Sequence, residues 1–360
     1  MGIKNWIKKV PFFLELDYFR RKVRDLPLFD FMVEPLAQVL EEWPRSLILD
    51  TTNQCNAKCV WCPNPDLEDM GTMKMDLYRR IIDDYASVGG IVHFGTFGEP
   101  LMDKTLSEKI KYARQKSSIK KVNILTNAFF LNEKTIPVLI EHSVGVDISL
   151  DELEKDTFEN VKKMSYDVTR RGILGLLEAN DRASNPVPVN LRIKTLMTRE
   201  AALANEFFKI LSGHNCTISL TPVNDNIISN WAGKFDKVGF FEKYLPSSGG
   251  NGSKYTHKRF NSTNTSPCTQ LWQWMIVYWN GEVVLCCADM FSRSTVGNLR
   301  EKSIKQVWNG EVLVELRKKM IARKRFEIPL CQNCDIHLSW HNLRSYYDKR
   351  GELQQDRSFI

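Results

Sequence analysis

The sequence predicts an α/β protein: a sheet of parallel strands covered by helices, followed by a small cysteine-rich unit. From Ser46 to about Pro222, short apolar runs typical of strands alternate with longer stretches typical of helices. Such repeated strand–helix units place their strands in parallel through right-handed crossovers. Two cysteine clusters, one near the start of this region and one after it, are separated by a stretch at 245–267 that is rich in Gly, Ser, Asn and Thr.

Six strands can be placed in order along the chain. The expected strands are Ser46–Asp50, Ile91–Gly95, Val122–Thr126, Val144–Leu150, Val187–Leu196 and Thr217–Leu220. The expected helices cover residues 75–87, 104–115, a longer region up to about 180, and 200–211. Because the carboxyl ends of parallel strands meet at one edge, we expect binding and catalytic residues on the loops that leave these strands.

Composition and charge narrow the class of protein. The chain has 360 residues, 43% of them hydrophobic, enough for a large core and one or two domains. It has no run of eighteen apolar residues, and charges interrupt the apolar residues at the N-terminus, which argues against a membrane span or a signal peptide. Nine cysteines, odd in number and clustered, favour reduced thiols and metal binding in the cytoplasm. The net charge of +7 is spread along the chain, which favours an anionic substrate or cofactor and not a nucleic-acid partner.

The first cysteine cluster follows the first strand directly. Cys55, Cys59 and Cys62 stand at spacings of four and three, on the loop that leaves Ser46–Asp50. A structural zinc site needs four ligands, and an iron–sulfur cube is normally held by four thiolates. Three thiolates would leave one iron open to a small molecule. The alternative is a damaged zinc site or an accidental group of reduced thiols.

This loop resembles the signature of the radical S-adenosylmethionine (radical SAM) enzymes, CxxxCx-aromatic-C, with Trp61 in the aromatic position. The resemblance implies a partial (β/α)6 barrel and a [4Fe-4S] cluster on Cys55, Cys59 and Cys62. The open iron would bind the amino and carboxylate groups of SAM, and one electron would cleave SAM to methionine and a 5′-deoxyadenosyl radical. A one-electron donor such as flavodoxin or ferredoxin is the implied partner.

A Gly-Glu-Pro turn follows the second expected strand. The family carries Gly-Gly-Glu-Pro at this place, and its groups meet the SAM amino nitrogen; here Gly98 and Glu99 match, while Phe97 replaces the first Gly. A glycine lets the backbone approach a ligand closely, and a carboxylate suits an ammonium group. The resemblance therefore implies that Gly98 and Glu99 bind SAM.

Other polar residues lie at the ends of the expected strands. Asn127 ends the third strand, Ser149 and Asp151 end the fourth, and Arg192 and Lys194 lie on the fifth. In similar enzymes, positions like Ser149 and Arg192 contact the ribose or carboxylate of SAM. We expect Asn127, Ser149 and Arg192 to bind SAM, with Asp151 and Lys194 as weaker candidates. The alternative is that each is a satisfied polar group at a strand end.

The second cysteine group surrounds a predicted hairpin with an Asn280-Gly281 turn, a strong two-residue turn signal. Its members are Cys268, Cys286, Cys331 and Cys334. Four thiolates bind zinc as readily as iron and sulfur, so spacing alone leaves the metal open. The order of the cysteines, a Gly-Asn pair, a helix with Trp308 and a final CxxC resembles the SPASM or twitch extension of radical SAM enzymes. Because no cysteine follows Cys334, the resemblance implies one auxiliary [4Fe-4S] cluster held by all four.

Two further cysteines stand apart from these sets. Cys287 adjoins a predicted cluster ligand, and Cys216 begins the sixth strand. Free cysteines are commonly small buried apolar residues. The functional hypothesis for Cys287 is a hydrogen-atom donor to a substrate radical, as in radical SAM epimerases.

The chain divides into five expected segments: 1–44, 45–244 (barrel), 245–267 (linker or lid), 268–335 (auxiliary-cluster domain) and 336–360 (tail). The N-terminal segment mixes Lys and Arg with aromatic residues. It either touches anionic lipid as a basic amphipathic surface or, as we favour, covers one end of the barrel. His337, Trp340 and His341 in the tail either line the substrate mouth or pack on the surface.

Three classes of function remain. The leading hypothesis is a radical SAM oxidoreductase that dehydrogenates a sugar or cyclitol alcohol, with epimerisation of a carbohydrate or ribosomal peptide by a cysteine donor as the alternative. A zinc-binding adaptor would explain seven cysteines and mild basicity but not the barrel pattern. The third is a membrane-surface enzyme that acts on a lipid-linked sugar.

Overall fold

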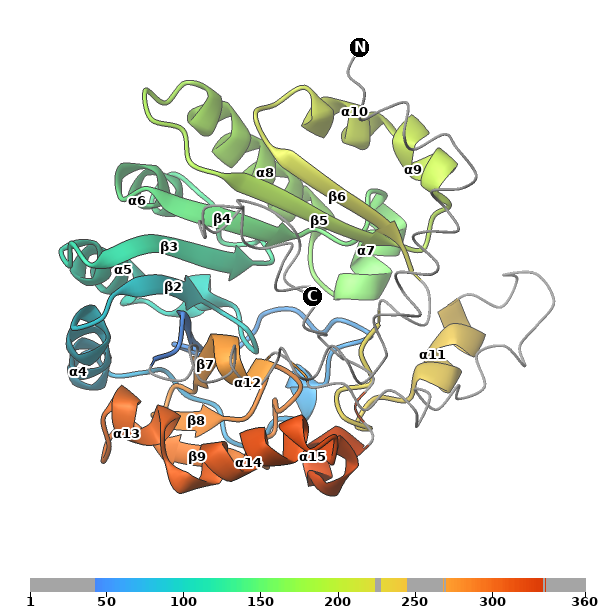
Figure 1. Cartoon of the computed structure of the whole chain (residues 1–360). Helices are drawn as coiled ribbons and strands as arrows, with labels where there is room; N and C mark the ends of the chain where they lie inside the picture. Colours follow the sequence, from blue (N-terminus) through green and yellow to red (C-terminus); the bar gives the residue numbers. More distant parts are fainter. Residues whose placement is uncertain (1–42, 224–227, 245–267, 269, 333, 335–360) are drawn as a thin grey trace, which may run out of the picture.

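The computed structural model describes residues 43–223, 228–244, 268, 270–332 and 334. Six parallel strands form the larger part of one sheet, in the spatial order β6-β5-β4-β3-β2-β1. They are β1 (Ser46–Leu49), β2 (Gly90–Phe94), β3 (Ile119–Thr126), β4 (Val144–Ser149), β5 (Val189–Thr195) and β6 (Thr217–Pro222). This arrangement confirms the predicted α/β class with parallel strands (Figure 1).

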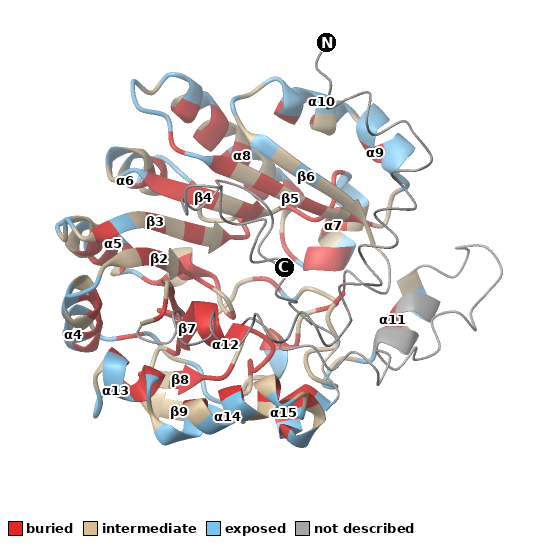
Figure 2. Cartoon of the chain, viewed as in Figure 1, coloured by how far each residue is buried: buried red, intermediate tan, exposed pale blue. Residues whose placement is uncertain are grey.

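Most of the helices between these strands lie against one face of the sheet (Figure 1). The helices are α4 (Met75–Ala86), α5 (Leu106–Arg114), α6 (Thr135–Glu141), α7 (Lys155–Lys162), α8 (Tyr166–Asp181), α9 (Arg199–Ala204) and α10 (Glu206–Ser212). In α4, buried Leu77, Tyr78, Ile81, Ile82 and Tyr85 recur at helical spacing, so one stripe faces the sheet. Figure 2 shows the same division, with buried strands and helices exposed on their outer sides. Helix α7 lies beyond the carboxyl ends of the strands (Figure 1).

The cysteine-rich unit continues the barrel sheet. Its elements are α12 (Gln270–Gln273), β7 (Trp274–Val277), β8 (Glu282–Val284), β9 (Thr295–Asn298), α13 (Ile304–Trp308), α14 (Glu311–Ile321), the short helix η4 (Arg325–Glu327) and α15 (Pro329–Gln332). Strand β7 pairs in parallel with β1, with Ser46 opposite Trp274, and then antiparallel with β8. The turn between β7 and β8 contains Asn280 and Gly281, as predicted, and Gly281 has a φ of 90°. The second unit is thus fastened to the strand that precedes the first cysteine cluster.

Some expectations differ from the structure. The helix expected at 200–211 is split, because Asn205 has extended backbone angles and its side chain accepts hydrogen bonds from the first turn of α10. Strand β9 and helix α6 are short and were not expected. The predicted N-terminal segment (apart from residues 43 and 44), the linker or lid and the whole tail, with His337, Trp340 and His341, lie outside the described residues.

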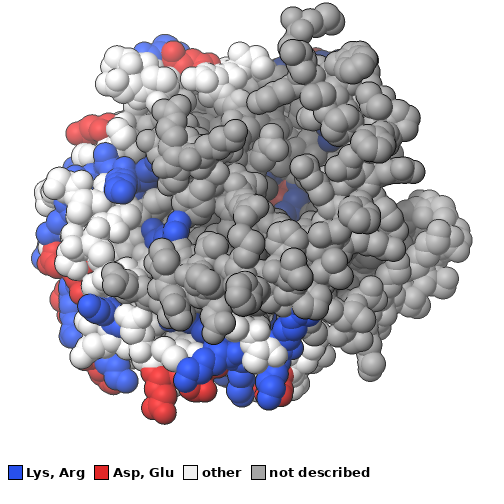
Figure 3. Space-filling model, in the orientation of Figure 1, with Lys and Arg blue, Asp and Glu red and all other residues white. Residues whose placement is uncertain are grey.

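The surface of the described part carries mixed charge. Figure 3 shows Lys and Arg interspersed with Asp and Glu, which agrees with the even spread of charge along the sequence. Helix α11 (Lys237–Tyr244) lies to one side of the barrel (Figure 1). None of the helices in the described ranges is both long enough and apolar enough to cross a bilayer.

Candidate functional site

The first three cysteines lie together on the loop that leaves β1, and each thiol is partly buried. The backbone N–H of Cys62 donates to the carbonyl of Cys59 at 3.0 Å. Two further backbone bonds fasten the loop to the end of α7: Lys58 N donates to Lys162 O at 3.1 Å, and Val60 N donates to Val161 O at 2.9 Å. The loop is therefore held between the end of β1 and the carboxyl end of α7.

Electrostatics show that the three thiols are neighbours. Burial, with charges on Glu99 and Cys59 adding to it, raises the pKa of Cys55 to about 11. Burial likewise raises the pKa of Cys62 to about 12, with charge on Cys59 and Cys55 adding to the effect. The thiols alone are thus protonated at neutral pH, and a metal cluster that binds them must displace their protons. Buried Lys162 opposes these shifts, so the site already holds a cation that suits thiolates.

The Gly-Glu-Pro turn packs directly against the cysteine loop. The N–H of Glu99 donates to the carbonyl of Gln54, the residue before Cys55, at 2.8 Å. A Cβ on Gly98 would lie 2.2 Å from the carbonyl oxygen of Thr52, so only glycine fits this close approach. The sequence therefore needs glycine here for the contact between the two loops, whatever the turn also binds.

Glu99 lies with both carboxylate oxygens turned to the protein. Its Oε1 accepts from Leu101 N at 3.0 Å and from Thr126 Oγ1 at 2.7 Å, while Oε2 accepts from Asn127 N at 2.7 Å. Burial raises its pKa, against these hydrogen bonds. In this structure Glu99 fastens the end of β2 to the end of β3. Its contact with the amino group of SAM stays a prediction.

Asn127 reaches the cysteine loop from the end of β3. Its Nδ2 donates to Asn56 Oδ1 at 2.9 Å and lies 3.9 Å from Cys55 Sγ. Its Oδ1 accepts from Phe129 N at 3.0 Å, which fixes the amide's orientation. The structure therefore places Asn127 next to a predicted cluster ligand, and its contact with SAM stays a prediction.

A buried ion pair supports Ser149 at the end of β4. Lys162 Nζ lies 2.7 Å from Asp151 Oδ2, with side chains that are 3% and 1% exposed. Ser149 Oγ donates to the same oxygen at 3.0 Å, and Lys162 Nζ donates to the Ser149 carbonyl at 3.0 Å. The predicted SAM contact of Ser149 stays a prediction, but its side chain is already oriented by Asp151.

The other face of β4 and β5 carries a polar row. On β5, buried Val189, Leu191, Ile193 and Thr195 alternate with half-buried Asn190, Arg192 and Lys194. Register places Asp147 opposite Asn190, and Ser149 opposite Arg192, on this same face. Arg192 Nη2 and Asn190 Nδ2 each lie 3.2 Å from Asp147 Oδ1. The face of the sheet away from the helices thus presents both hydrogen-bond donors and hydrogen-bond acceptors.

His93 extends the polar row onto β2. Register places it beside Asn123 of β3, whose Nδ2 lies 3.4 Å from His93 Nδ1. Burial lowers its pKa to about 4 from the usual 6.5, with Asp147 opposing and Arg192 adding to this effect. The ring is therefore neutral at pH 7.

We predict a measurable pH effect of His93 on stability. Because its pKa is lower in the folded chain than in the unfolded chain, the neutral ring contributes stability above pH 6.5 that is lost as pH falls toward 4. The free energy of unfolding is expected to fall between pH 7.5 and pH 5.5, and in His93→Gln this fall should be smaller by about 1 kcal/mol. Urea unfolding of both chains at the two pH values measures this difference. Identical pH dependence in both chains would contradict the assignment.

Trp61 fills the aromatic position of the motif but packs away from the polar row. It is 8% exposed and lies in an apolar cluster with Val161, Ile228 and Phe240. The rings of Trp61 and Phe240 meet edge to face with centroids 5.9 Å apart. Its contact with a cofactor stays a prediction, and its visible role is to fix the cysteine loop against α7.

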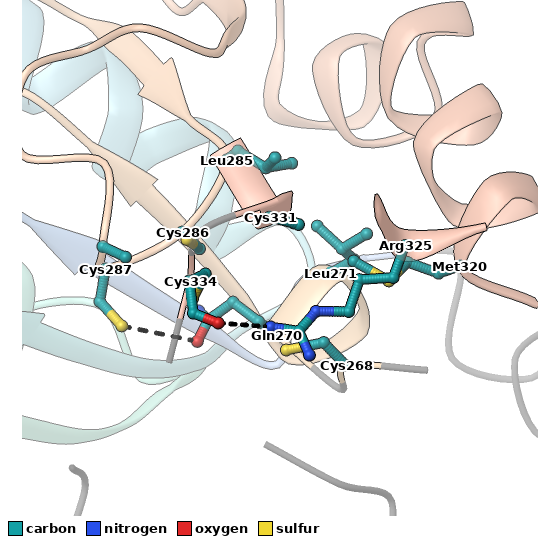
Figure 4. Close-up of a pocket in the computed structure, with 11 residues that line it drawn as sticks. Cys268, Gln270, Leu271, Leu285, Cys286, Cys287, Met320, Arg325, Cys331 and Cys334 are labelled. Atoms are coloured by element: carbon teal, nitrogen blue, oxygen red, sulfur yellow. Dashed lines mark hydrogen bonds between the residues drawn. The ribbon is translucent and has the colours of Figure 1, made fainter. Parts of the chain in front are cut away.

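The four cysteines of the second group line one cavity of about 30 Å3. Cys286 follows β8 and Cys331 lies on α15, while Cys268 and Cys334 flank the unit (Figure 4). Burial, with charges on Cys268 and Cys334 adding to it, raises the pKa of Cys331 to about 12, so these thiols are close neighbours. Among the described residues, no three Cys, His, Asp or Glu side chains are arranged to hold a single metal ion.

Cys287 lies at the edge of this cavity with its sulfur directed at Gln270. The thiol is buried and lies 3.9 Å from Gln270 Oε1 (Figure 4). Cys287 also packs with Ile48, Phe97 and Tyr278 in a small apolar cluster. Cys216 donates its S–H to the carbonyl of Leu211 at 3.4 Å, which fits a packing role.

Sequence reasoning missed three charged residues of these sites. Lys162 and Asp50 lie next to the first cysteine loop, and Arg325 lies in the second cavity. The Oδ1 atom of Asp50 accepts a hydrogen bond from Phe97 N at 3.1 Å. Because Asp50 directly follows β1, its position could have been predicted from the sequence. Lys162 and Arg325 have charged neighbours in the sequence, a pattern typical of solvent-exposed residues, so the sequence does not indicate that they are buried.

The two cysteine sets, one after β1 and one around the cavity of the second unit, are suited to hold iron–sulfur clusters. Family comparison agrees. Residues 49–189 match the radical SAM superfamily, and residues 268–335 match SPASM, an iron–sulfur cluster-binding domain. The chain belongs to the radical SAM superfamily and carries a SPASM domain. It is thus a radical SAM enzyme that binds SAM on a [4Fe-4S] cluster and also holds an auxiliary iron–sulfur cluster.

Several known proteins are similar over most of the chain. The tungsten-containing aldehyde ferredoxin oxidoreductase cofactor-modifying protein of Pyrococcus furiosus is 23% identical and covers 81% of this chain and 87% of its own. The S-adenosyl-L-methionine-dependent 2-deoxy-scyllo-inosamine dehydrogenase of Niallia circulans is 22% identical, over 80% and 91%. The crystal structure of BtrN in complex with AdoMet and 2-DOIA superposes with a TM-score of 0.54 at 20% identity, over 82% and 94%. The last supports the fold alone.

Proposed function

We propose that this radical SAM enzyme dehydrogenates a polyhydroxylated small molecule, a sugar or cyclitol, at one alcohol carbon. The observation that most supports this proposal is the polar row of Asp147, Asn190 and Arg192 on the face of the sheet away from the helices. Hydroxyl groups need donors and acceptors at fixed positions, and this row offers both. The similarity to a 2-deoxy-scyllo-inosamine dehydrogenase supports the same substrate class.

Each cysteine set has an assigned role in this proposal. Cys55, Cys59 and Cys62 hold the SAM-binding cluster, and Cys268, Cys286, Cys331 and Cys334 hold one auxiliary [4Fe-4S] cluster. When bound, the first cluster with SAM supplies a hydrogen-abstracting radical, and the second supplies an electron acceptor. A one-electron donor of the flavodoxin or ferredoxin kind is the proposed partner.

The chain's own residues orient the substrate and handle the proton. The alcohol carbon loses a hydrogen atom; the hydroxyl proton and one further electron then leave, and a C=O bond forms. The proton needs an acceptor that is unprotonated at neutral pH. His93 lies on the same face as the polar row, and its ring is neutral at pH 7, so it offers an unprotonated ring nitrogen there, although burial makes this nitrogen a weak base. We propose that Arg192, which is paired with Asp147, holds a neighbouring hydroxyl group; its expected contact with SAM stays a prediction.

The test is a mass measurement on candidate aminocyclitols and sugars, incubated anaerobically with the reconstituted chain, SAM and dithionite. We expect a product lighter by about two hydrogens, formed in step with 5′-deoxyadenosine. Cys287→Ser is expected to keep most of this activity, because oxidation needs no hydrogen donor.

The alternative, epimerisation with Cys287 as hydrogen donor, is favoured by the burial of this thiol beside the four-cysteine cavity. It predicts a product of unchanged mass in water, deuterium uptake from heavy water, and loss of product with Cys287→Ser while SAM cleavage persists. That set of results would replace dehydrogenation as the proposed reaction.

A further inference from the structure

Two polar side chains share the cavity of the second cysteine set. Besides the four cysteines, the lining is mostly apolar, with Leu271, Leu285 and Met320 among its members. Gln270 and Arg325 are the exceptions among the described lining residues. Figure 4 shows both side chains extending among the cysteines, Gln270 from α12 and Arg325 from the start of η4.

Arg325 is a buried cation with an unused donor. Its residue is 1% exposed, and its Nη2 donates to the carbonyl of Cys334 at 2.9 Å. Its Nη1 is buried and has no hydrogen-bond partner within the part of the chain that the structure describes. In the same described ranges no carboxylate forms an ion pair with it. Burial of a guanidinium in this state is costly, so a negatively charged group in the cavity is the natural counterpart.

Gln270 presents a second donor to the same space. It is 3% exposed, and its Oε1 accepts from the thiol of Cys287. This bond orients the amide, and Nε2 is left buried with no partner among the described residues. An unsatisfied amide N–H of this kind is unfavourable, because the group has given up its hydrogen bonds to water without a replacement. Two independent side chains therefore bring unused N–H donors to a cavity lined by cysteine sulfurs.

We propose that Arg325 Nη1 and Gln270 Nε2 donate hydrogen bonds to sulfur atoms of the auxiliary cluster and raise its reduction potential. This inference rests on the proposed assignment of the four cysteines as ligands. A cluster held by four thiolates is negatively charged, and reduction by one electron adds to that charge. A fixed cation and N–H donors stabilise the reduced form more than the oxidised form, because hydrogen bonds to sulfur and local charge set cluster potentials.

The functional consequence concerns the electron that leaves the substrate. An auxiliary cluster that accepts this electron must be readily reduced in a buried, mostly apolar cavity, where low polarity disfavours added charge. The positive charge of Arg325 and the N–H group of Gln270 offset the cost of adding this negative charge. They act through the cluster and are positioning residues.

The experiment is a redox titration of the auxiliary cluster in the full chain, followed by electron paramagnetic resonance. Cys55, Cys59 and Cys62 are replaced by alanine in every sample, so that only the second cluster contributes to the signal. We compare this background with Arg325→Met, Gln270→Met and Arg325→Lys. Lys324→Met, which removes the adjacent exposed cation, is the matched control.

We expect Arg325→Met to make reduction at least tenfold less favourable, which for a one-electron couple is a shift of about 59 mV to more negative potential. Gln270→Met is expected to shift the potential in the same direction by less, because it removes a donor without a charge. Arg325→Lys is expected to recover part of the shift, and Lys324→Met to leave the potential unchanged.

Unchanged or more positive potentials in both Met variants, with the cluster present, would overturn the proposal. If Arg325→Met fails to assemble the cluster, Gln270→Met decides, since it leaves the Arg325–Cys334 bond in place. Failure of the underlying assignment has a different signature: the background itself would contain no iron–sulfur cluster, and removal of Cys331 and Cys334 would not change its iron content.

Discussion

Replacement of Cys59 by alanine is expected to remove the SAM-binding cluster and reduce SAM cleavage to the background of the assay. Cys59 is the middle thiol of the loop, and its backbone carbonyl also accepts the bond that turns the chain toward Cys62. With two thiolates left, the loop can no longer hold the cluster. The iron content should fall by about four atoms per chain, measured after anaerobic reconstitution.

The matched control for this change is Cys216→Ala. Cys216 lies at the start of β6 and bonds only a nearby carbonyl in the described structure, so its loss should leave both iron content and SAM cleavage as they were. A Cys59→Ala chain that keeps its full iron content and cleaves SAM would show that this loop does not hold the cluster.

Lys162→Met is expected to lower the free energy of unfolding by about 3 to 5 kcal/mol. The ammonium group is fully surrounded by protein, and its loss leaves the carboxylate of Asp151 buried without its counter-charge. Burial acts to lower the pKa of Lys162, but the charge of Asp151 and its hydrogen bond act against burial, so the pKa is raised and the group stays charged. Urea unfolding of the anaerobic protein, followed by circular dichroism, measures the change.

Two further variants separate the buried charge from other effects. Asp151→Asn added to Lys162→Met should recover a large part of the loss, because asparagine keeps an acceptor for Ser149 and tolerates the φ of 70° at this position. Lys155→Met breaks the exposed ion pair with Asp167 and should change stability by no more than the experimental error. Equal effects of Lys162→Met and Lys155→Met would contradict a special role for the buried pair.

Much of the fold could be predicted from local pattern. The apolar runs at β1 to β6 are strong strand signals, and Asn280-Gly281 specifies the hairpin turn by its backbone requirement. The pairing of β7 with β1 could not be predicted. These strands lie more than 200 residues apart in the sequence, and both are short apolar runs that would suit several neighbours.

The site, too, has residues that could be predicted from the sequence and residues that could not. The spacing of Cys55, Cys59 and Cys62 and the Gly98-Glu99 turn carry their own chemical signal, and the structure brings them together through the bond from Glu99 N to Gln54 O. The burial of Lys162 has no local signature, because a lysine at a helix end is usually solvated. The position of Lys162 depends on Asp151, which follows β4 and has a left-handed backbone conformation with a φ of 70°.

The most direct test of the account is the formation of 5′-deoxyadenosine by the full chain after reconstitution with iron and sulfide. The protein is incubated anaerobically with SAM and dithionite, and 5′-deoxyadenosine and methionine are quantified by chromatography. The account predicts equal amounts of both products, which disappear with Cys59→Ala. A reconstituted chain that holds its iron but releases no 5′-deoxyadenosine would contradict it.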